Sequence, residues 1–150
     1  MGIKEKLLSD LKESLKAGNK LKVSVVRLLI SSIKSKEIDK RGEISDEETL
    51  AVLSQAAKMR REAIEEFAKG KRDDLVQKEK QELEIIGSYL PEQISEEKLR
   101  EIAKEVILEV SATSIKDIGK VMKVLMPRIK GQADGKIVNK IVQQSLENQQ

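Results

Sequence analysis

The sequence of 150 residues contains no cysteine, no histidine and no tryptophan. Without cysteine there is no disulfide and no thiol nucleophile, and without cysteine or histidine the usual ligands of zinc are missing. The lack of histidine also excludes every mechanism in which imidazole acts as a general base. Phe67 and Tyr89 are the only aromatic residues, which argues against aromatic platforms for base stacking and aromatic-lined ligand cages. We therefore expect no catalytic residue, no metal site and no cofactor.

Long hydrophobic runs are missing as well. The longest stretch, residues 23–30, is interrupted by Ser24 and Arg27, whereas a membrane span needs about 18 apolar residues. The first residues are charged and helical in pattern, without the apolar segment and cleavage site of a secretory signal. From these absences the sequence predicts a cytoplasmic protein that has no membrane partner.

Charge is distributed unevenly along the chain, although the net charge is only +3, from 29 basic and 26 acidic residues. Residues 1–91 carry +2 and residues 92–111 carry −3. Residues 112–146 hold seven basic residues against Asp117 and Asp134, which gives +5. By this count the positive excess lies near the C-terminus.

Apolar residues recur at spacings of three and four along most of the chain, which is the pattern of a helix with one buried face. This spacing assigns Leu7, Leu8 and Leu15 to the buried face of the first helix, and Leu28 to that of the second. Ser45 and Glu48 form a capping box that opens the third helix. The patterns predict helices over about 3–17, 20–39, 45–70 and 73–90, and shorter helices that start at Ser95, Ser114 and Asp134.

The predicted helices change in length at Pro91, which disfavours a helical conformation at Leu90. No repeat of 20 to 50 residues and no low-complexity linker is present. We therefore expect an all-α fold with two parts. Residues 1–91 form an N-terminal lobe of about four helices, and residues 92–150 form a small C-terminal lobe of three helices.

Two patterns invite a catalytic interpretation, and both have a simpler one. Ser31 and Lys34, like Ser95 and Lys98, have the Ser-x-x-Lys spacing in which a lysine activates a serine. The partner motifs of the enzymes that use this spacing are absent, so a solvated helix face and a helix cap are favoured. The glutamates at 65, 66, 79, 82 and 84 alternate with lysines, which is typical of exposed, salt-bridged helices rather than of an acid–base pair.

A group of basic residues near the C-terminus forms the candidate binding site. Lys116, Lys120 and Lys123 are spaced to share one helix face, and the glycines and lysines of residues 130–136 resemble loops that bind phosphate. Because the group has few acids and no aromatics, it suits a phosphate backbone whose shape is recognised, without preference for DNA. A solvated face and a turn capped by Asp134 remain the alternatives. The candidate RNA-binding residues are Lys116, Lys120, Lys123, Arg128, Lys130, Gly131, Lys136, Asn139 and Lys140.

Several segments together resemble the YqeY-like family. Near the C-terminus the resemblance is carried by Gly119–Met122, Leu125–Pro127, Lys130–Gly131, Ala133–Lys136 and Asn139. Before them it is carried by Arg60–Phe67, Arg72–Leu75 and Tyr89–Ser95. That family is related to the C-terminal tail domain of the B subunit of tRNA-dependent amidotransferases, which contacts tRNA. The resemblance therefore implies a two-part helical fold and contact with tRNA, whereas nothing here matches the amidase or kinase sites of those enzymes. Gln132 stands where the family commonly has Lys or Arg.

Three functions remain open at this point. The first is a non-catalytic accessory protein that binds tRNA or another structured RNA through its C-terminal lobe. The second is a protein-interaction module that docks on an aminoacyl-tRNA or amidotransferase complex. The third, implied by the resemblance alone, is a subunit linked to carbon–nitrogen ligase activity with glutamine as amide donor.

Overall fold

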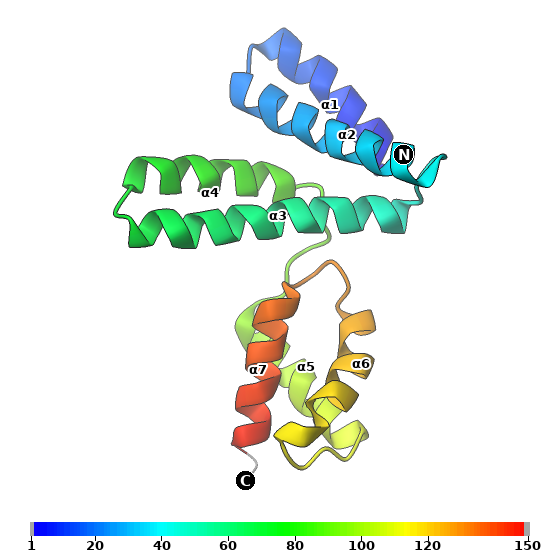
Figure 1. Ribbon diagram of the computed structural model, residues 1–150, viewed down its shortest axis with the longest axis vertical. Helices are drawn as coiled ribbons and strands as arrows, with labels where there is room; N and C mark the ends of the chain where they lie inside the picture. Colours follow the sequence, from blue (N-terminus) through cyan, green and yellow to red (C-terminus); the bar gives the residue numbers. More distant parts are fainter. Residues whose placement is uncertain (1, 149–150) are drawn as a thin grey trace. The chain divides into compact units, whose positions relative to one another are not determined.

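The computed structural model describes residues 2–148, and within them the chain forms helices and no strand (Figure 1). This confirms the prediction of an all-α fold. The helices are α1 (Ile3–Ala17), α2 (Lys20–Lys40), α3 (Asp46–Lys69), α4 (Asp73–Gly87), α5 (Glu96–Glu109), the short 3₁₀ helix η1 (Ile115–Asp117), α6 (Ile118–Arg128) and α7 (Gly135–Glu147).

Contacts divide the chain into two compact units, Met1–Pro91 and Glu92–Gln150. The last helix of the first unit is shorter than the sequence predicts, because α4 ends at Gly87 and not at Leu90. Three residues of tight turn follow, in which the amide of Tyr89 donates to Ile86 and the amide of Leu90 donates to Gly87. A turn before Pro91 is expected, since proline restricts the residue that precedes it.

The first unit consists of two helical hairpins. Gly18, whose φ of 71° favours glycine, ends α1 and lets the chain turn directly into α2. The α3–α4 hairpin packs against α2 (Figure 1). Its core is aliphatic except for Tyr89, and its buried residues are Leu7, Val25, Val26, Leu29, Ile33, Ile44, Val52, Leu53, Ala57, Ile86 and Tyr89.

Tyr89 joins the two ends of this unit. Its hydroxyl donates a hydrogen bond to a carboxylate oxygen of Asp10 on α1, 79 positions earlier in the chain. Burial raises the pKa of Tyr89, and the neighbouring Asp10 raises it further. The Lys6 ammonium lies 5.4 Å from the centre of the same ring. The only tyrosine of the chain therefore fixes α1 to the segment that leads out of the unit.

The apolar stripe of the first hairpin is wider than the surface that covers it. Leu7 is fully buried, but Leu8 and Leu15 are half exposed, and so is Leu28 on α2. The prediction that these three residues are buried is wrong. The α1 helix packs mainly against α2 and only slightly against α3, so within residues 2–148 no helix covers the outer part of its stripe.

An ion cluster fastens α3 to α4. The Arg60 Nε atom lies 2.9 Å from a carboxylate oxygen of Glu82 and 3.5 Å from one of Glu79, and all three side chains are less than a fifth exposed. Burial raises the pKa of Glu79, and the adjacent Glu82 raises it further. The interpretation of these glutamates as exposed is therefore wrong for Glu79 and Glu82, whereas Glu65, Glu66 and Glu84 do lie in solvent.

The second unit is a bundle of α5, α6 and α7 around its own core. Its buried side chains are Leu99, Ala103, Val106, Ile107, Ala112, Val121, Leu125, Ile129, Val138, Ile141, Val142 and Leu146. The segment before α5 is tied to the loop before α7, because the amide of Ile94 donates to the carbonyl of Gln132 at 2.9 Å. All the buried residues of this core lie between Leu99 and Leu146, so the core contains no residue of the first unit.

A fragment of residues 92–150 should fold alone, because its core needs no residue from the first unit. We expect a helical circular-dichroism spectrum and a cooperative thermal transition. A spectrum without helical signal, or a gradual melt, would show that the second unit depends on the first.

Replacing Arg60 by Met should lower the free energy of unfolding by about 3 kcal/mol at pH 7, since it leaves two partly buried carboxylates together without a cation. The loss should shrink at pH 5. Without Arg60 the folded-state pKa of Glu79 stays above its unfolded value, so protonation favours the folded variant at low pH and this gain disappears as pH rises. Urea unfolding at both pH values measures the effect.

Arg72→Met is the matched control, because the Arg72–Asp74 pair is more than half exposed. It should change stability by less than about 1 kcal/mol. If the two variants lose the same free energy of unfolding, burial does not make the Arg60 cluster more stabilising than an exposed ion pair.

Candidate nucleic-acid interface

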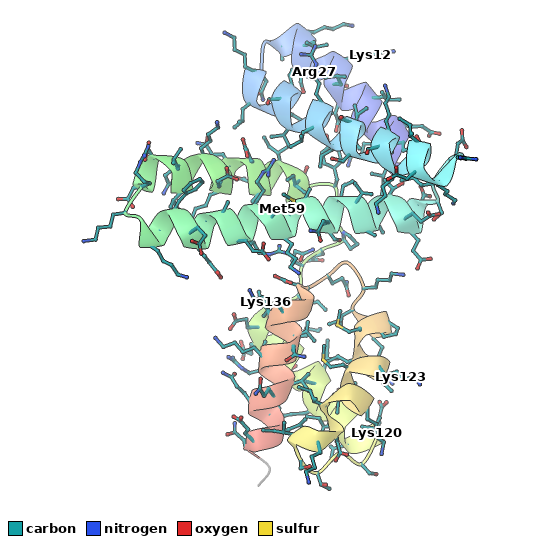
Figure 2. All side chains as sticks on the ribbon, in the orientation of Figure 1. Lys12, Arg27, Met59, Lys120, Lys123 and Lys136 are labelled. Atoms are coloured by element: carbon teal, nitrogen blue, oxygen red, sulfur yellow. The ribbon has the colours of Figure 1, made fainter. Side chains whose placement is uncertain are left out.

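The first group of predicted site residues lies on one side of η1 and α6. Lys116, Lys120 and Lys123 are exposed, while Val121 and Leu125 on the opposite side of α6 are buried. Figure 2 shows Lys120 and Lys123 projecting from α6 away from the rest of the unit. Among residues 2–148, no carboxylate forms an ion pair with any of these three lysines. We call this group the α6 basic surface.

One acid lies close to the α6 basic surface. Asp117 accepts a hydrogen bond from the amide of Thr113 at 2.9 Å and a longer one from the amide of Ser114. These two amides hold the pKa of Asp117 below its ordinary value, and the nearby Lys120 adds to the effect. Asp117 is therefore ionised at neutral pH, and its role is to fix the turn before η1.

Arg128 does not extend this surface as a free cation. Its guanidinium forms two hydrogen bonds with the carboxylate of Glu109 on α5, one of them 3.0 Å long. The same contact holds the pKa of Glu109 below its ordinary value. The pair is about half exposed, so Arg128 is accessible, but its charge is balanced by Glu109.

The loop that contains Lys130 and Gly131 is built as a turn. Gly131 has a φ of 76°, and its carbonyl accepts a hydrogen bond of 2.9 Å from the side-chain amide of Gln93. Asp134 caps α7 by accepting from the amide of Lys136 at 3.1 Å. Because this amide already donates to Asp134, it is not available to a phosphate. The start of α7 is therefore a weaker phosphate site than its glycines and lysines suggest.

The remaining predicted residues lie on α7. Lys136, Asn139 and Lys140 are exposed there, and the spacing of the two lysines places them on one helix face. Figure 2 shows Lys136 on the α7 side of the unit and Lys120 and Lys123 on the α6 side. The structure thus forms two basic groups, one on η1 and α6 and one on α7, and not a single continuous stripe.

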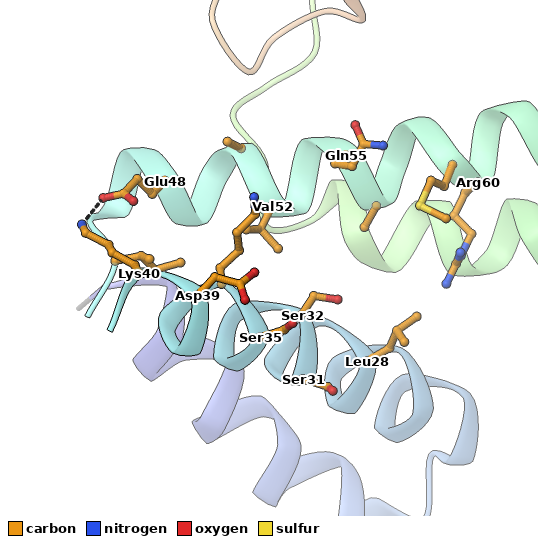
Figure 3. A pocket seen from close by; sticks show the side chains of 15 residues that line it. Leu28, Ser31, Ser32, Ser35, Asp39, Lys40, Glu48, Val52, Gln55 and Arg60 are labelled. Atoms are coloured by element: carbon orange, nitrogen blue, oxygen red, sulfur yellow. Dashed lines mark hydrogen bonds and ion pairs between the residues drawn. The ribbon is translucent and has the colours of Figure 1, made fainter. Parts of the chain in front are cut away.

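A groove between α2 and α3 is a second candidate site (Figure 3). It has a volume of about 1090 Å³, and its apolar mouth includes the half-exposed Leu28 and Met59. Ser31, Ser32 and Ser35 line it from α2, and Lys40 closes one end through an ion pair of 2.7 Å with Glu48. The groove is not purely apolar, since Lys36, Asp39 and Arg60 also line it. A groove between two helices with apolar residues at its mouth and charged residues around them suits an amphipathic partner helix.

The Ser31–Lys34 spacing does not produce a serine–lysine pair in the structure. Ser31 lines the groove between α2 and α3, whereas Lys34 lines a different hollow, next to Glu37. Ser95 caps α5 by accepting a hydrogen bond from the amide of Lys98 at 3.2 Å. Within residues 2–148 there is also no group of three acidic side chains placed to hold a metal ion. None of the helices described has the length and apolarity of a membrane span.

The first unit contains a basic region that the net charge of residues 1–91 does not reveal. The sequence of the α1–α2 hairpin, residues 1–42, has eleven basic and five acidic residues, a net charge of +6. Residues 43–91 have eight basic and twelve acidic residues, so one window over both reports only +2. Counting charge hairpin by hairpin would have found this excess, which is larger than that of residues 112–146.

Comparison with curated proteins finds relatives named "Altered inheritance of mitochondria protein 41, mitochondrial". The relative from Lachancea thermotolerans is 45% identical over 85 residues, which cover 56% of this chain and 46% of the relative. Those from Saccharomyces cerevisiae strain YJM789 and Vanderwaltozyma polyspora are each 40% identical with the same coverage. The chain therefore spans about half the length of the curated relatives it matches.

These names contradict the prediction of a cytoplasmic protein, because the matched relatives are described as mitochondrial. That prediction rested on the absence of apolar segments, which cannot distinguish the cytoplasm from other aqueous compartments.

A comparison with protein families gives a match over nearly the whole chain. The model described as "Yqey-like protein" matches residues 4–146, which include all the helices of both units except the first residue of α1 and the last of α7. The resemblance noted in the sequence is confirmed by this match, and the chain belongs to the YqeY-like family.

Proposed function

We propose that the protein is a non-catalytic accessory factor whose second unit binds structured RNA, in particular tRNA, through the phosphate backbone. The observation that carries this proposal is the α6 basic surface, with three exposed lysines on one side of η1 and α6. Phosphate contacts of this kind supply most of the affinity of sequence-independent RNA binding.

The lack of aromatic residues around these lysines favours structured RNA as the ligand. The two exposed basic groups lie on a unit with no tryptophan or phenylalanine, so its surface suits a folded backbone better than unstacked bases. The resemblance to the tail domain of the amidotransferase B subunit, which contacts tRNA, supports tRNA in particular.

A second candidate function is favoured by the groove between α2 and α3. Its exposed Leu28 and Met59 and its small side chains suit docking of a helix from a protein of an aminoacyl-tRNA or amidotransferase complex. The two functions are compatible, because the groove and the basic groups lie in different units. RNase treatment before a pull-down separates partners held by RNA from partners held by the groove.

Replacing Lys120 and Lys123 together by Glu should weaken tRNA binding by more than tenfold. If about four lysines of the unit each meet a phosphate, the logarithm of affinity falls with the logarithm of salt concentration at a slope of roughly −3 to −4. The double variant should flatten that slope, as measured by filter binding between 50 and 200 mM salt.

Lys98→Glu with Lys104→Glu is the matched control, because both residues are exposed on α5 of the same unit. This control should change affinity much less. An equal effect of both pairs, or binding that is independent of salt, would show that the α6 basic surface is only a solvated face.

Replacing Glu109 by Gln should strengthen tRNA binding, since it frees the charge of Arg128 for one further phosphate. The salt slope should become more negative by roughly 0.7 to 0.9, the value for one added contact. Glu101→Gln, which removes a charge from the same helix without touching Arg128, is the control. Equal slopes for the two variants would exclude Arg128 from the interface.

A further inference from the structure

One exposed face of α2 carries basic residues at a constant interval. Four basic residues follow one another every seven positions, and a residue between each two continues the face at spacings of four and three. We call this face the α2 basic face. Its seven members, all exposed, are Lys20, Ser24, Arg27, Ser31, Lys34, Ile38 and Arg41. Figure 2 shows Arg27 on this hairpin.

The helix backbone sets the spacing of the four cations. Seven residues of helix advance about 10 Å along the axis and turn by only about 20° around it. Arg41 ends α2 with a φ of 61°, and it lines one surface hollow together with Lys34 and Ile38, so it continues the row. The row from Lys20 to Arg41 is therefore about 30 Å long, and its spacing exists before any ligand binds.

The four cations are not engaged with acids of the chain. Within residues 2–148 no carboxylate forms an ion pair with any of them. Two other lysines of the same hairpin do have such partners, since Lys4 pairs with Glu37 and Lys40 pairs with Glu48. The charge of the α2 basic face is therefore available to a ligand, whereas other charges of the hairpin stabilise the fold.

Acids approach the face at one end only. Glu37 and Glu43 line the hollow that contains Lys34. Glu37 is already bonded to the Lys4 ammonium, and it accepts a hydrogen bond of 3.2 Å from the amide of Ile44. At the other end, the residues that line the hollow around Lys20 and Arg27 include no acid. Most of the row is therefore free of opposing charge.

The residues between the cations suit a polynucleotide backbone better than an apolar partner. A partner helix or a membrane surface needs a row of apolar residues, whereas Ile38 is the single large apolar residue of this face. Ser24 and Ser31 carry hydroxyls, which donate to phosphate oxygens. Phe67 and Tyr89, the only aromatic residues of the chain, lie on other elements, so bases cannot stack here.

We propose that the α2 basic face is a second RNA-binding surface, which contacts the phosphate backbone of a structured RNA along the length of α2. The net charge of +6 on residues 1–42 attracts the same ligand to the hairpin. The proposal rests on the proposed function in taking structured RNA as the ligand. It adds a contact surface in the first unit, where no RNA contact is otherwise assigned.

Filter binding of tRNA to the full-length protein tests this surface. Arg27→Gln with Lys34→Gln should weaken binding at least about tenfold at about 100 mM salt, because two phosphate contacts are lost. The salt slope should become less negative by roughly 1.4 to 1.8, the value for two contacts. Both residues are exposed, so the circular-dichroism spectrum should not change.

Lys78→Gln with Lys80→Gln is the matched control, because it removes the same charge from exposed positions on α4 of the same unit. The control should keep affinity within about twofold. Equal losses for both pairs would mean that only net charge matters, and would overturn the proposal. Unchanged tRNA binding by the Arg27 and Lys34 variant would overturn it too. If that variant then loses binding to polyglutamate, the face docks an acidic protein.

Ser24→Glu gives a second test in which every cation is kept. It places a carboxylate between Lys20 and Arg27 and should weaken tRNA binding about fivefold by repelling phosphate. Ser24→Gln has the same size without the charge and should bind tRNA as the unaltered protein does. Equal affinities for the Glu and Gln variants would place the RNA away from this face.

Combination with the Lys120 and Lys123 variant separates this proposal from the proposed function. If Lys120→Glu with Lys123→Glu weakens tRNA binding and Arg27→Gln with Lys34→Gln does not, only the second unit binds RNA and the α2 basic face is excluded. The opposite result supports the α2 basic face and excludes the α6 basic surface. Losses for each pair that persist when the pairs are combined support both surfaces, and no tRNA binding by the unaltered protein overturns both.

Discussion

Burial of one aliphatic stripe per helix, within each unit separately, is the constraint on which the rest of this structure depends. With one tyrosine, one phenylalanine and no tryptophan, the cores are formed almost entirely by leucine, isoleucine, valine and alanine. Each helix therefore packs through a narrow face and exposes a wide face to solvent. That wide face accommodates a chain in which 37% of the residues are charged, and it is where every candidate binding group lies.

The charged faces are sorted by sign. The α1–α2 hairpin carries an excess of positive charge, residues 43–111 carry an excess of negative charge, and positive charge returns at η1, α6 and α7. Two of the ion pairs, Arg60 with Glu82 and Arg128 with Glu109, each join two different helices. The lysines at 116, 120 and 123 lie in a segment with few acids and have no such partner within residues 2–148. A cation of such a segment is balanced where another helix brings an acid to it, as α5 brings Glu109 to Arg128, and it stays available to a ligand where none does.

Sequence patterns predicted the helices well because their signals are local. The glycine at 18, the capping box at Ser45 and Glu48, and the caps at Ser95 and Asp134 each act within one turn, and each is present in the structure. Features that depend on a second helix were not predictable in this way. Leu8 and Leu28 repeat with the spacing of core residues, but their exposure depends on how much surface the neighbouring helices cover. The burial of Glu79 and Glu82 depends on where α3 places Arg60, and the pairing of Arg128 depends on α5.

The hydrogen bond between Tyr89 and Asp10 has a consequence for the order in which the chain acquires its structure. It joins residues 79 positions apart, so α1 cannot gain this contact on the ribosome until almost all of the first unit has been synthesised. The hairpin of α1 and α2, with its exposed leucines and its excess of positive charge, is complete in sequence by residue 40. During translation it therefore emerges as a basic, partly apolar segment before the α3–α4 hairpin exists to cover one side of it. For that interval the hairpin presents to the ribosome and its RNA a more cationic surface than the finished protein does.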